Sequence, residues 1–132
     1  MGLEFSISEN VTESLREIAS RADDLPMQDI SDILLQSVRE NFLAQGRPDP
    51  WTPRVDNPYD DGHPLLMDTM ALYNSLYADV TADEVEINSG EDYGEYLDQG
   101  TSKMVARPFF IIQEEDADRI EDLLAQHLDM AD

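Results

Sequence analysis

The side chains able to do chemistry are few in this sequence, and they form no known catalytic pattern. It contains two histidines, His63 and His127, and no cysteine, which excludes a thiol nucleophile, a disulfide and a Cys-ligated metal. It has no Gly-x-Ser-x-Gly elbow, no His-Glu-x-x-His motif and no Gly-rich phosphate loop. With 30 acidic residues, carboxylate pairs arise by chance and indicate no active site. We therefore expect a protein that is not an enzyme and that needs no metal or cofactor.

Three aspartates and a histidine lie close enough in the sequence to suggest a metal site: Asp56, Asp60, Asp61 and His63. A calcium loop needs oxygen ligands at its first and third positions and Gly at its sixth. If Gly62 takes the sixth position, the first and third positions are Asn57 and Tyr59, which breaks the pattern. We interpret this segment as a solvated acidic loop. His127 lies beside the apolar stripe of a predicted helix, where packing is its commoner role.

Charge is the most unusual property of the composition. Eight basic and 30 acidic residues give a formal net charge of −22, and Lys103 is the single lysine. Such a charge argues against binding to nucleic acid or to an anionic membrane. The acidic residues are spread along the whole chain, which favours adaptation to molar salt over mimicry of DNA by one acidic face. In 1 M salt the Debye length is about 3 Å, so the carboxylates repel one another much less.

The first half of the chain is predicted to form one strand and two helices. Apolar and polar residues alternate over residues 3–7, which is typical of a half-buried strand. Asn10 fits the N-cap of the first helix, with Glu13 three residues later. Pro26 suits the first turn of the second helix, and Gly46 fits the position after its C-cap. The apolar stripes of these helices are Val11, Leu15, Ile18 and Ala22, and Met27, Ile30, Leu34, Val38 and Phe42.

The second half is predicted to add a hairpin and a last helix. Residues 65–78 begin as a short helix, capped by Asp68 or Thr69, and run into a strand that turns back at residues 82–84. Residues 114–129 carry the apolar stripe of a C-terminal helix. The fold class is therefore α+β: a small antiparallel sheet packed against two longer helices, with a C-terminal helix. At 132 residues it is one domain, residues 1–132.

Two segments are candidates for contacts with other subunits. The proline-rich loop 47–64 contains Trp51, which either plugs the core beneath the loop or packs on a neighbouring subunit. In the segment 92–110, an aromatic turn at Tyr93 and Tyr96 is followed by a Gly-Thr break and by Arg107-Pro108. Proline suits the first residue of a strand, so the apolar run that begins at Phe109 is predicted to be a buried strand over residues 109–112.

Four segments occur in an order that resembles the phage virion morphogenesis family. They are the helix and loop from Ile33 to Pro53, the segment Leu66–Leu76, the turn Tyr93–Thr101, and Ala106–Phe109. They are similar to the family's helix with its Trp-x-Pro loop, its Leu-x-x-Thr-Gly-x-Leu-x-x-Ser segment, its Tyr-Ala-x-x-His-x-x-Gly-Thr turn and its Ala-Arg-Pro-Phe. Pro50 and Met70 stand where the family usually has Gly, and Tyr96 stands where it often has His.

The resemblance implies a structural virion protein of a tailed virus. It would form a tail-completion or head–tail joining ring in the neck, made in the host cytoplasm, with itself and other neck, connector and tail proteins as partners. It would need no membrane and no direct sequence-specific contact with nucleic acid. The residues expected at subunit or partner contacts are Trp51, Tyr93, Tyr96, Arg107 and Phe109. The alternative is an acidic DNA mimic that acts as an inhibitor.

The net charge of −22 leads to a prediction about folding. In low salt the carboxylates repel one another and should loosen the fold, whereas molar KCl or NaCl should restore it because it screens that repulsion. The thermal midpoint, measured by circular dichroism, should therefore rise from about 0.05 M to about 2 M salt. A midpoint as high at the lower salt as at the higher one would contradict adaptation to salt.

Overall fold

The computed structural model describes residues 2–19, 24–53, 65–67, 70–102 and 105–130. Strands and helices follow one another in this order: β1 (Leu3–Ser6), α1 (Ile7–Asn10), α2 (Glu13–Ala19), α3 (Met27–Leu43), α4 (Ala71–Asn74), β2 (Leu76–Val80), β3 (Glu84–Ser89), α5 (Gly94–Gln99) and α6 (Glu114–Met130). The predicted α+β class, its antiparallel sheet, its long second helix and its C-terminal helix are confirmed.

The sheet has three strands in the order β1-β3-β2, and both of its pairings are antiparallel. The register sets Leu3 opposite Ile87 and Phe5 opposite Val85, so the buried side chains of the two strands share one face. β2 and β3 form the predicted hairpin, which is closed by a hydrogen bond from the Thr81 N–H to the Glu84 carbonyl at 2.9 Å. The opposite face of the sheet carries polar side chains.

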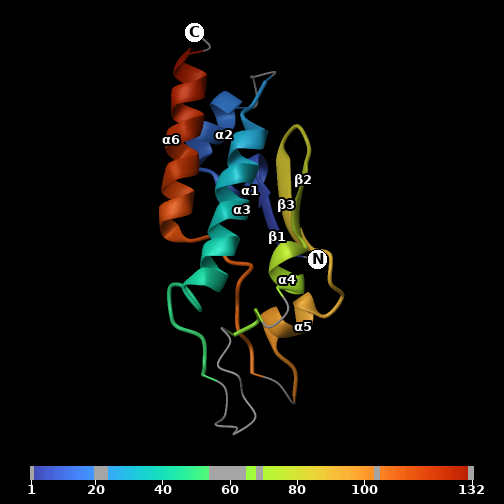
Figure 1. Ribbon diagram of the computed structural model, residues 1–132. Coiled ribbons are helices and arrows are strands. Elements are labelled where there is room, and N and C mark those ends of the chain that lie inside the picture. Colours follow the sequence, from blue (N-terminus) through green and yellow to red (C-terminus); the bar gives the residue numbers. More distant parts are fainter. Residues whose placement is uncertain (1, 20–23, 54–64, 68–69, 103–104, 131–132) are drawn as a thin grey trace, which may run out of the picture.

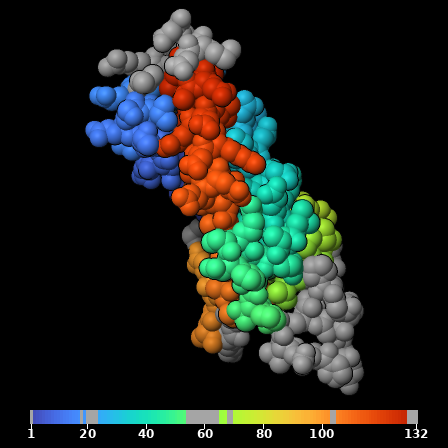
Figure 2. Space-filling view, turned by 90° about the vertical axis from the view of Figure 1, so that its left-hand side faces the viewer, coloured from blue at the N-terminus to red at the C-terminus, as the bar shows by residue number. Residues whose placement is uncertain are grey.

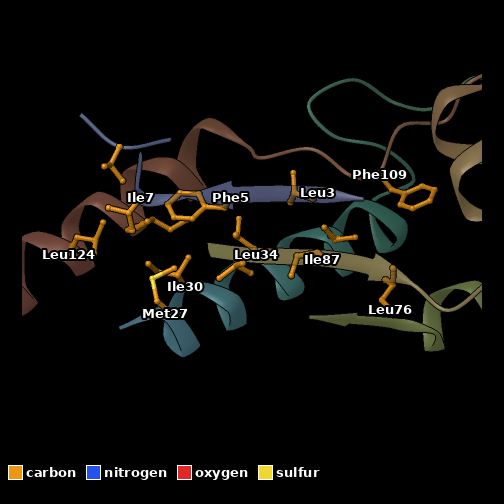
Figure 3. Close-up of a cluster of buried hydrophobic side chains, with 14 of the residues drawn as sticks. Leu3, Phe5, Ile7, Met27, Ile30, Leu34, Leu76, Ile87, Phe109 and Leu124 are labelled. Atoms are coloured by element: carbon orange, nitrogen blue, oxygen red, sulfur yellow. The ribbon is translucent and has the colours of Figure 1, made fainter. Parts of the chain in front are cut away.

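The long helices form the other side of the core. α3 lies along the inner face of the sheet, and α6 runs beside α3 and α2 (Figure 1). The stripe of α3 is predicted correctly, because all five of its members are buried, and Figure 3 shows Met27, Ile30 and Leu34 among the core side chains. The fully buried members are Ile30, Leu34, Val38 and Phe42. Their spacing of four residues places them on one face of the helix.

The predicted N-cap of the first helix is wrong. Asn10 is the last residue of the short helix α1, and its Oδ1 accepts a hydrogen bond from the Ser6 N–H at 2.9 Å. An asparagine side chain can satisfy a free N–H on either side of a turn, which local sequence alone does not decide. The helix that follows begins at Glu13, and Ala22 of the predicted stripe lies outside the described residues.

The end of α3 differs by one residue from the prediction. Ala44 is the C-cap, and the residue after it is Gln45, with a left-handed φ of 60°, while Gly46 comes next at a φ of 115°. The Gln45 N–H bonds to the Phe42 carbonyl and the Gly46 N–H bonds to the Asn41 carbonyl, which is the pattern of a Schellman motif. The turn sends the chain back so that the Trp51 N–H reaches the Gln45 carbonyl at 2.8 Å.

Gly46 is predicted to be indispensable to this turn. A Cβ at this position would lie 2.5 Å from the Trp51 nitrogen, on a backbone with a φ that L-residues rarely adopt. Gly46→Ala should lower the free energy of unfolding by about 1–3 kcal/mol, measured by denaturant titration. Gly90→Ala is the matched control, because its Cβ would come no closer than 3.3 Å to its nearest neighbour. Equal losses in the two variants would show that the turn tolerates a side chain.

Candidate functional site

Trp51 lies in the core of its own subunit. Its side chain is buried, with 6% of the residue exposed, and its Nε1 donates a hydrogen bond to the Pro108 carbonyl at 2.7 Å. Its ring meets the Phe42 ring edge-on, with the centroids 5.7 Å apart. Of the two alternatives for this residue, the structure shows burial in the core of its own subunit.

The predicted strand over residues 109–112 is wrong. Residues 105–113 belong to no strand or helix, and side chains satisfy the backbone groups in the first part of this segment. The N–H groups of Phe109 and Phe110 both donate to Asp98 Oδ1, at 2.9 and 3.0 Å, and the Phe109 carbonyl accepts from Asn41 Nδ2 at 2.7 Å. The apolar character was read correctly, since Phe109 is fully buried against Phe42. An apolar run becomes a strand only where another strand is present to pair with it.

Arg107 holds two segments of its own subunit together. Its backbone N–H donates to the Leu97 carbonyl at 2.9 Å, and its Nε donates to the Thr52 carbonyl at 3.0 Å. Within the described residues its Nη1 and Nη2 donate to no protein atom, and the ion pairs found there belong to Arg47 instead. Arg107 thus pins the proline-rich loop, and its contact with another subunit stays a prediction.

The tyrosines of the predicted aromatic turn lie at a short helix rather than a turn. Tyr93 is the N-cap of α5 and Tyr96 lies one turn later, and these two residues are 44% and 56% exposed. The spacing of three residues puts both rings on one side of the helix. Partial burial, and then the carboxylate of Glu91, raise the pKa of the Tyr93 hydroxyl. A tyrosine hydroxyl is protonated at neutral pH in any case and can donate a hydrogen bond.

Arg47, which the sequence analysis missed, organises this end of the molecule. Its side chain is 19% exposed and uses all three nitrogens. Nε donates to Asn41 Oδ1 at 2.8 Å, and Nη2 donates to the carbonyl and the hydroxyl of Ser37, both at 2.8 Å. Nη1 pairs with Glu40 at 3.2 Å and with Glu115 at 2.9 Å. A guanidinium has five N–H groups, and here each has an acceptor.

A second set of hydrogen bonds ties the same cluster to the start of α6. The buried carboxylate of Asp116 accepts from the Ser37 hydroxyl and from the Gln113 N–H, the latter at 3.1 Å. Gln113 Nε2 donates to the Arg47 carbonyl at 3.0 Å and to Asn41 Oδ1 at 3.3 Å. Figure 2 shows the segment after α3, in green, lying directly against the orange end of α6. The cluster therefore locks together α3, the loop and α6.

A signal for this cluster was present in the sequence. Asn41 interrupts the apolar face of a long helix, and Arg47, one of eight basic residues, follows the glycine that ends that helix. A buried polar side chain demands a partner, and a scarce Arg next to the helix end is the obvious candidate.

Metal-binding residues do not gather in the described part of the chain. No group of three or more His, Cys, Asp or Glu side chains is placed there to hold an ion. The acidic loop 56–63, with His63, lies outside those residues. His127 Nε2 contacts the Asp24 carbonyl, which joins α6 to the segment before α3.

The comparisons with known proteins decide the family. The model of the phage virion morphogenesis family matches residues 6–129. The chain belongs to this family. No curated protein and no solved structure matches it. Family membership gives the protein a structural or assembly role in a phage virion and implies interaction with other virion proteins. Among the described residues, no helix is long and apolar enough to cross a bilayer.

One departure from the family pattern is explained by the backbone. Met70 stands where the family usually has Gly, and its φ of 63° lies in the left-handed region that glycine favours. Met70 is the N-cap of α4, so the turn keeps the conformation of a glycine although the residue has changed. The predicted caps, Asp68 and Thr69, lie outside the described residues.

Removal of the Arg47 guanidinium should destabilise the fold. Arg47→Met leaves the Ser37 carbonyl and Asn41 Oδ1 with fewer partners, and should lower the free energy of unfolding by about 2–3 kcal/mol. The two ion pairs add little to this because their carboxylates are exposed. Arg119→Met is the control, since Arg119 is exposed on α6 and the change in net charge is the same. Denaturant titration that gave equal losses for both variants would show that only charge matters.

Proposed function

We propose that this phage virion protein is a neck component that forms a tail-completion or head–tail joining ring. The supporting observation is that one end of the molecule exposes tyrosines on a backbone that its own subunit holds in place. We call this end the loop end; it comprises residues 44–53, α5 and residues 105–113. In Figure 1 it lies at the bottom, away from the C-terminus of α6.

Prearranged contact surfaces suit such a ring. Association costs less free energy when the contact residues are ordered beforehand. At the loop end, Asp98, Asn41 and Trp51 satisfy the backbone of residues 108–110. Tyr93 and Tyr96 are exposed on the adjoining helix, and tyrosine is enriched among residues that dominate binding. Trp51 and Phe109 would support the contact from behind.

Arg107 supplies the polar part of the proposed contact. Its Nε donates to the Thr52 carbonyl, while its Nη1 and Nη2 can donate to a carboxylate of a neighbouring copy. Every copy carries a net charge of −22, so such carboxylates are abundant on the neighbouring surface. A contact between different surfaces of identical copies closes into a ring when the rotation between them allows it.

The distribution of acidic side chains favours this role over DNA mimicry. Exposed carboxylates occur along α6, at Asp118 and Asp122, and also on the polar face of the sheet, at Glu4 and Asp79. α6 runs beside α3, on the other side of the core from that polar face (Figure 1). A DNA mimic would gather its carboxylates in one stripe, whereas here exposed carboxylates lie on both α6 and the polar face of the sheet.

Arg107→Ala tests the ring. The variant should keep its circular dichroism spectrum and should assemble far less readily, because loss of an interface anchor costs about 2 kcal/mol or more, roughly thirtyfold in affinity. Sedimentation of the isolated chain and electron microscopy of particles that carry the variant are the measurements. We expect unjoined heads and tails.

The matched control is Arg119→Ala, which makes the same change of charge on exposed α6 and should assemble normally. Arg107→Lys separates charge from geometry, because lysine keeps the charge and loses the planar fork. Intact virions with a folded Arg107→Ala subunit would show that Arg107 serves only the fold of its own chain.

A further inference from the structure

We propose that the outer edge of β2 is a docking site for an extended, basic segment of another virion protein, which adds a fourth strand to the sheet. The proposal rests on the assembly role proposed above and assigns the chemistry of one partner. It concerns the side of the sheet and leaves the loop end free for the ring contact.

The register shows which backbone groups of β2 face outward. The Thr81 N–H bonds to the Glu84 carbonyl and the Gly90 N–H bonds to the Ser75 carbonyl. Hydrogen-bonded pairs alternate along an antiparallel ladder, so Tyr77 and Asp79 also bond toward β3. The backbone N–H and C=O groups between them point away from the sheet; they belong to Leu76, Ala78 and Val80.

These outward groups are available to a partner strand. Within the described residues they make no hydrogen bond, and β2 forms the outer side of the hairpin in Figure 1. Proteins often protect such an edge with charged side chains (lysine above all), proline or a bulge. β2 contains no proline and no lysine, its one charged residue is Asp79 on the polar face, and its five residue pairs with β3 run without interruption. The edge is therefore able to pair with an extended chain.

Charge specifies the partner. The register places Glu4, Glu86 and Asp79 opposite one another in one row across the polar face. Like charges directly opposite one another are destabilising, and the one hydrogen-bond donor beside this row is Asn88 Nδ2, 2.6 Å from Glu86 and 3.5 Å from Asp79 among the described residues. A hollow of about 410 Å³ beside the row is lined by five acidic residues and no basic one: Glu4, Glu9, Asp79, Glu84 and Glu86. A lysine or arginine opposite Asp79 would continue the row with the opposite charge.

On the inner face of the sheet, β2 favours apolar residues at alternate positions of an added strand. Ala78 is half-buried and Val80 is 38% exposed, although they pair with the buried Ile87 and Val85. An apolar side chain on an added strand would cover Val80. The segment that fits this edge therefore alternates basic and apolar residues.

A second copy of this chain fits the edge less well. Pairing β2 with another β2 would bring a second set of carboxylates beside the first, in a protein with a net charge of −22. The described strands of the chain contain no basic residue that could face Asp79. Charge complementarity thus points to a different protein.

A synthetic peptide of alternating valine and lysine is the probe, with a valine–glutamate peptide for comparison. Each is titrated into the full chain at the lowest salt that leaves its circular dichroism unchanged. We expect the basic peptide to bind, to protect the amides of Ala78 and Val80 from hydrogen exchange, and to bind more weakly in added salt. Absence of binding, equal binding of the acidic peptide, or protection at other amides would overturn the proposal.

Two variants locate the site. Ala78→Pro removes an outward N–H while sparing the bonds to β3, so the folded variant should bind at least tenfold more weakly (about 1.4 kcal/mol). Asp79→Asn should weaken binding by a factor of about two to five. Asp118→Asn on exposed α6 is the control with the same change in charge. If folded Ala78→Pro binds the peptide as well as the parent chain does, the docking proposal is contradicted. It is also contradicted if the amides of β2 are protected without peptide and that protection rises with protein concentration, which would indicate pairing of two copies.

The experiments distinguish a failure of the docking proposal from a failure of the ring proposal. Peptide binding is measured on the isolated subunit, and ring assembly is measured with loop-end variants that leave β2 unchanged. A subunit that binds the peptide but forms no ring contradicts the function proposed above alone. A ring whose subunits ignore the peptide contradicts the docking site alone.

Discussion

The guanidinium of Arg47 is the interaction on which the loop end of this protein depends. It fills the space between α3, the loop and α6 with hydrogen bonds to Ser37, Asn41, Glu40 and Glu115. In a chain with 30 acidic and eight basic residues, this half-buried cation joins α3, the loop and α6. The cluster stands at the point where the last turn of α3 gives way to irregular backbone. Its rigidity is what allows a segment without secondary structure to hold a defined shape.

Irregular backbone at the loop end is stabilised by side chains where a sheet would use other strands. Asp98 accepts two consecutive N–H groups, Asn41 donates to one carbonyl and Trp51 donates to the preceding one. Buried backbone groups must find partners, and these three side chains come from three different parts of the chain. The backbone beside the exposed tyrosines of α5 is thus held by its own subunit, as the proposed contact requires. The same surface in a flexible loop would lose much of the binding free energy to ordering.

Acidity shapes how such a subunit can assemble. Repulsion between copies disfavours contacts that bring carboxylates together, so favourable contacts must use apolar groups, the few arginines, or basic partners. The loop end offers tyrosines and Arg107, whereas the polar face of the sheet offers carboxylates and a free strand edge. The two surfaces therefore suit different kinds of partner. Assembly with both at once is possible because they lie on different parts of the body.

The sequence by itself determined the elements whose stability is local in origin. The period of α3 and α6, the β2–β3 hairpin and the α+β class follow from apolar spacing and turn residues, which act over a few positions. Tertiary structure alone decided that residues 109–112 form no strand and that Trp51 packs inward. Tertiary structure also made Arg47 the centre of the site. In each of these cases the residue has several possible hydrogen-bond or packing partners, and the partner it takes lies on a segment whose approach only the complete fold brings about.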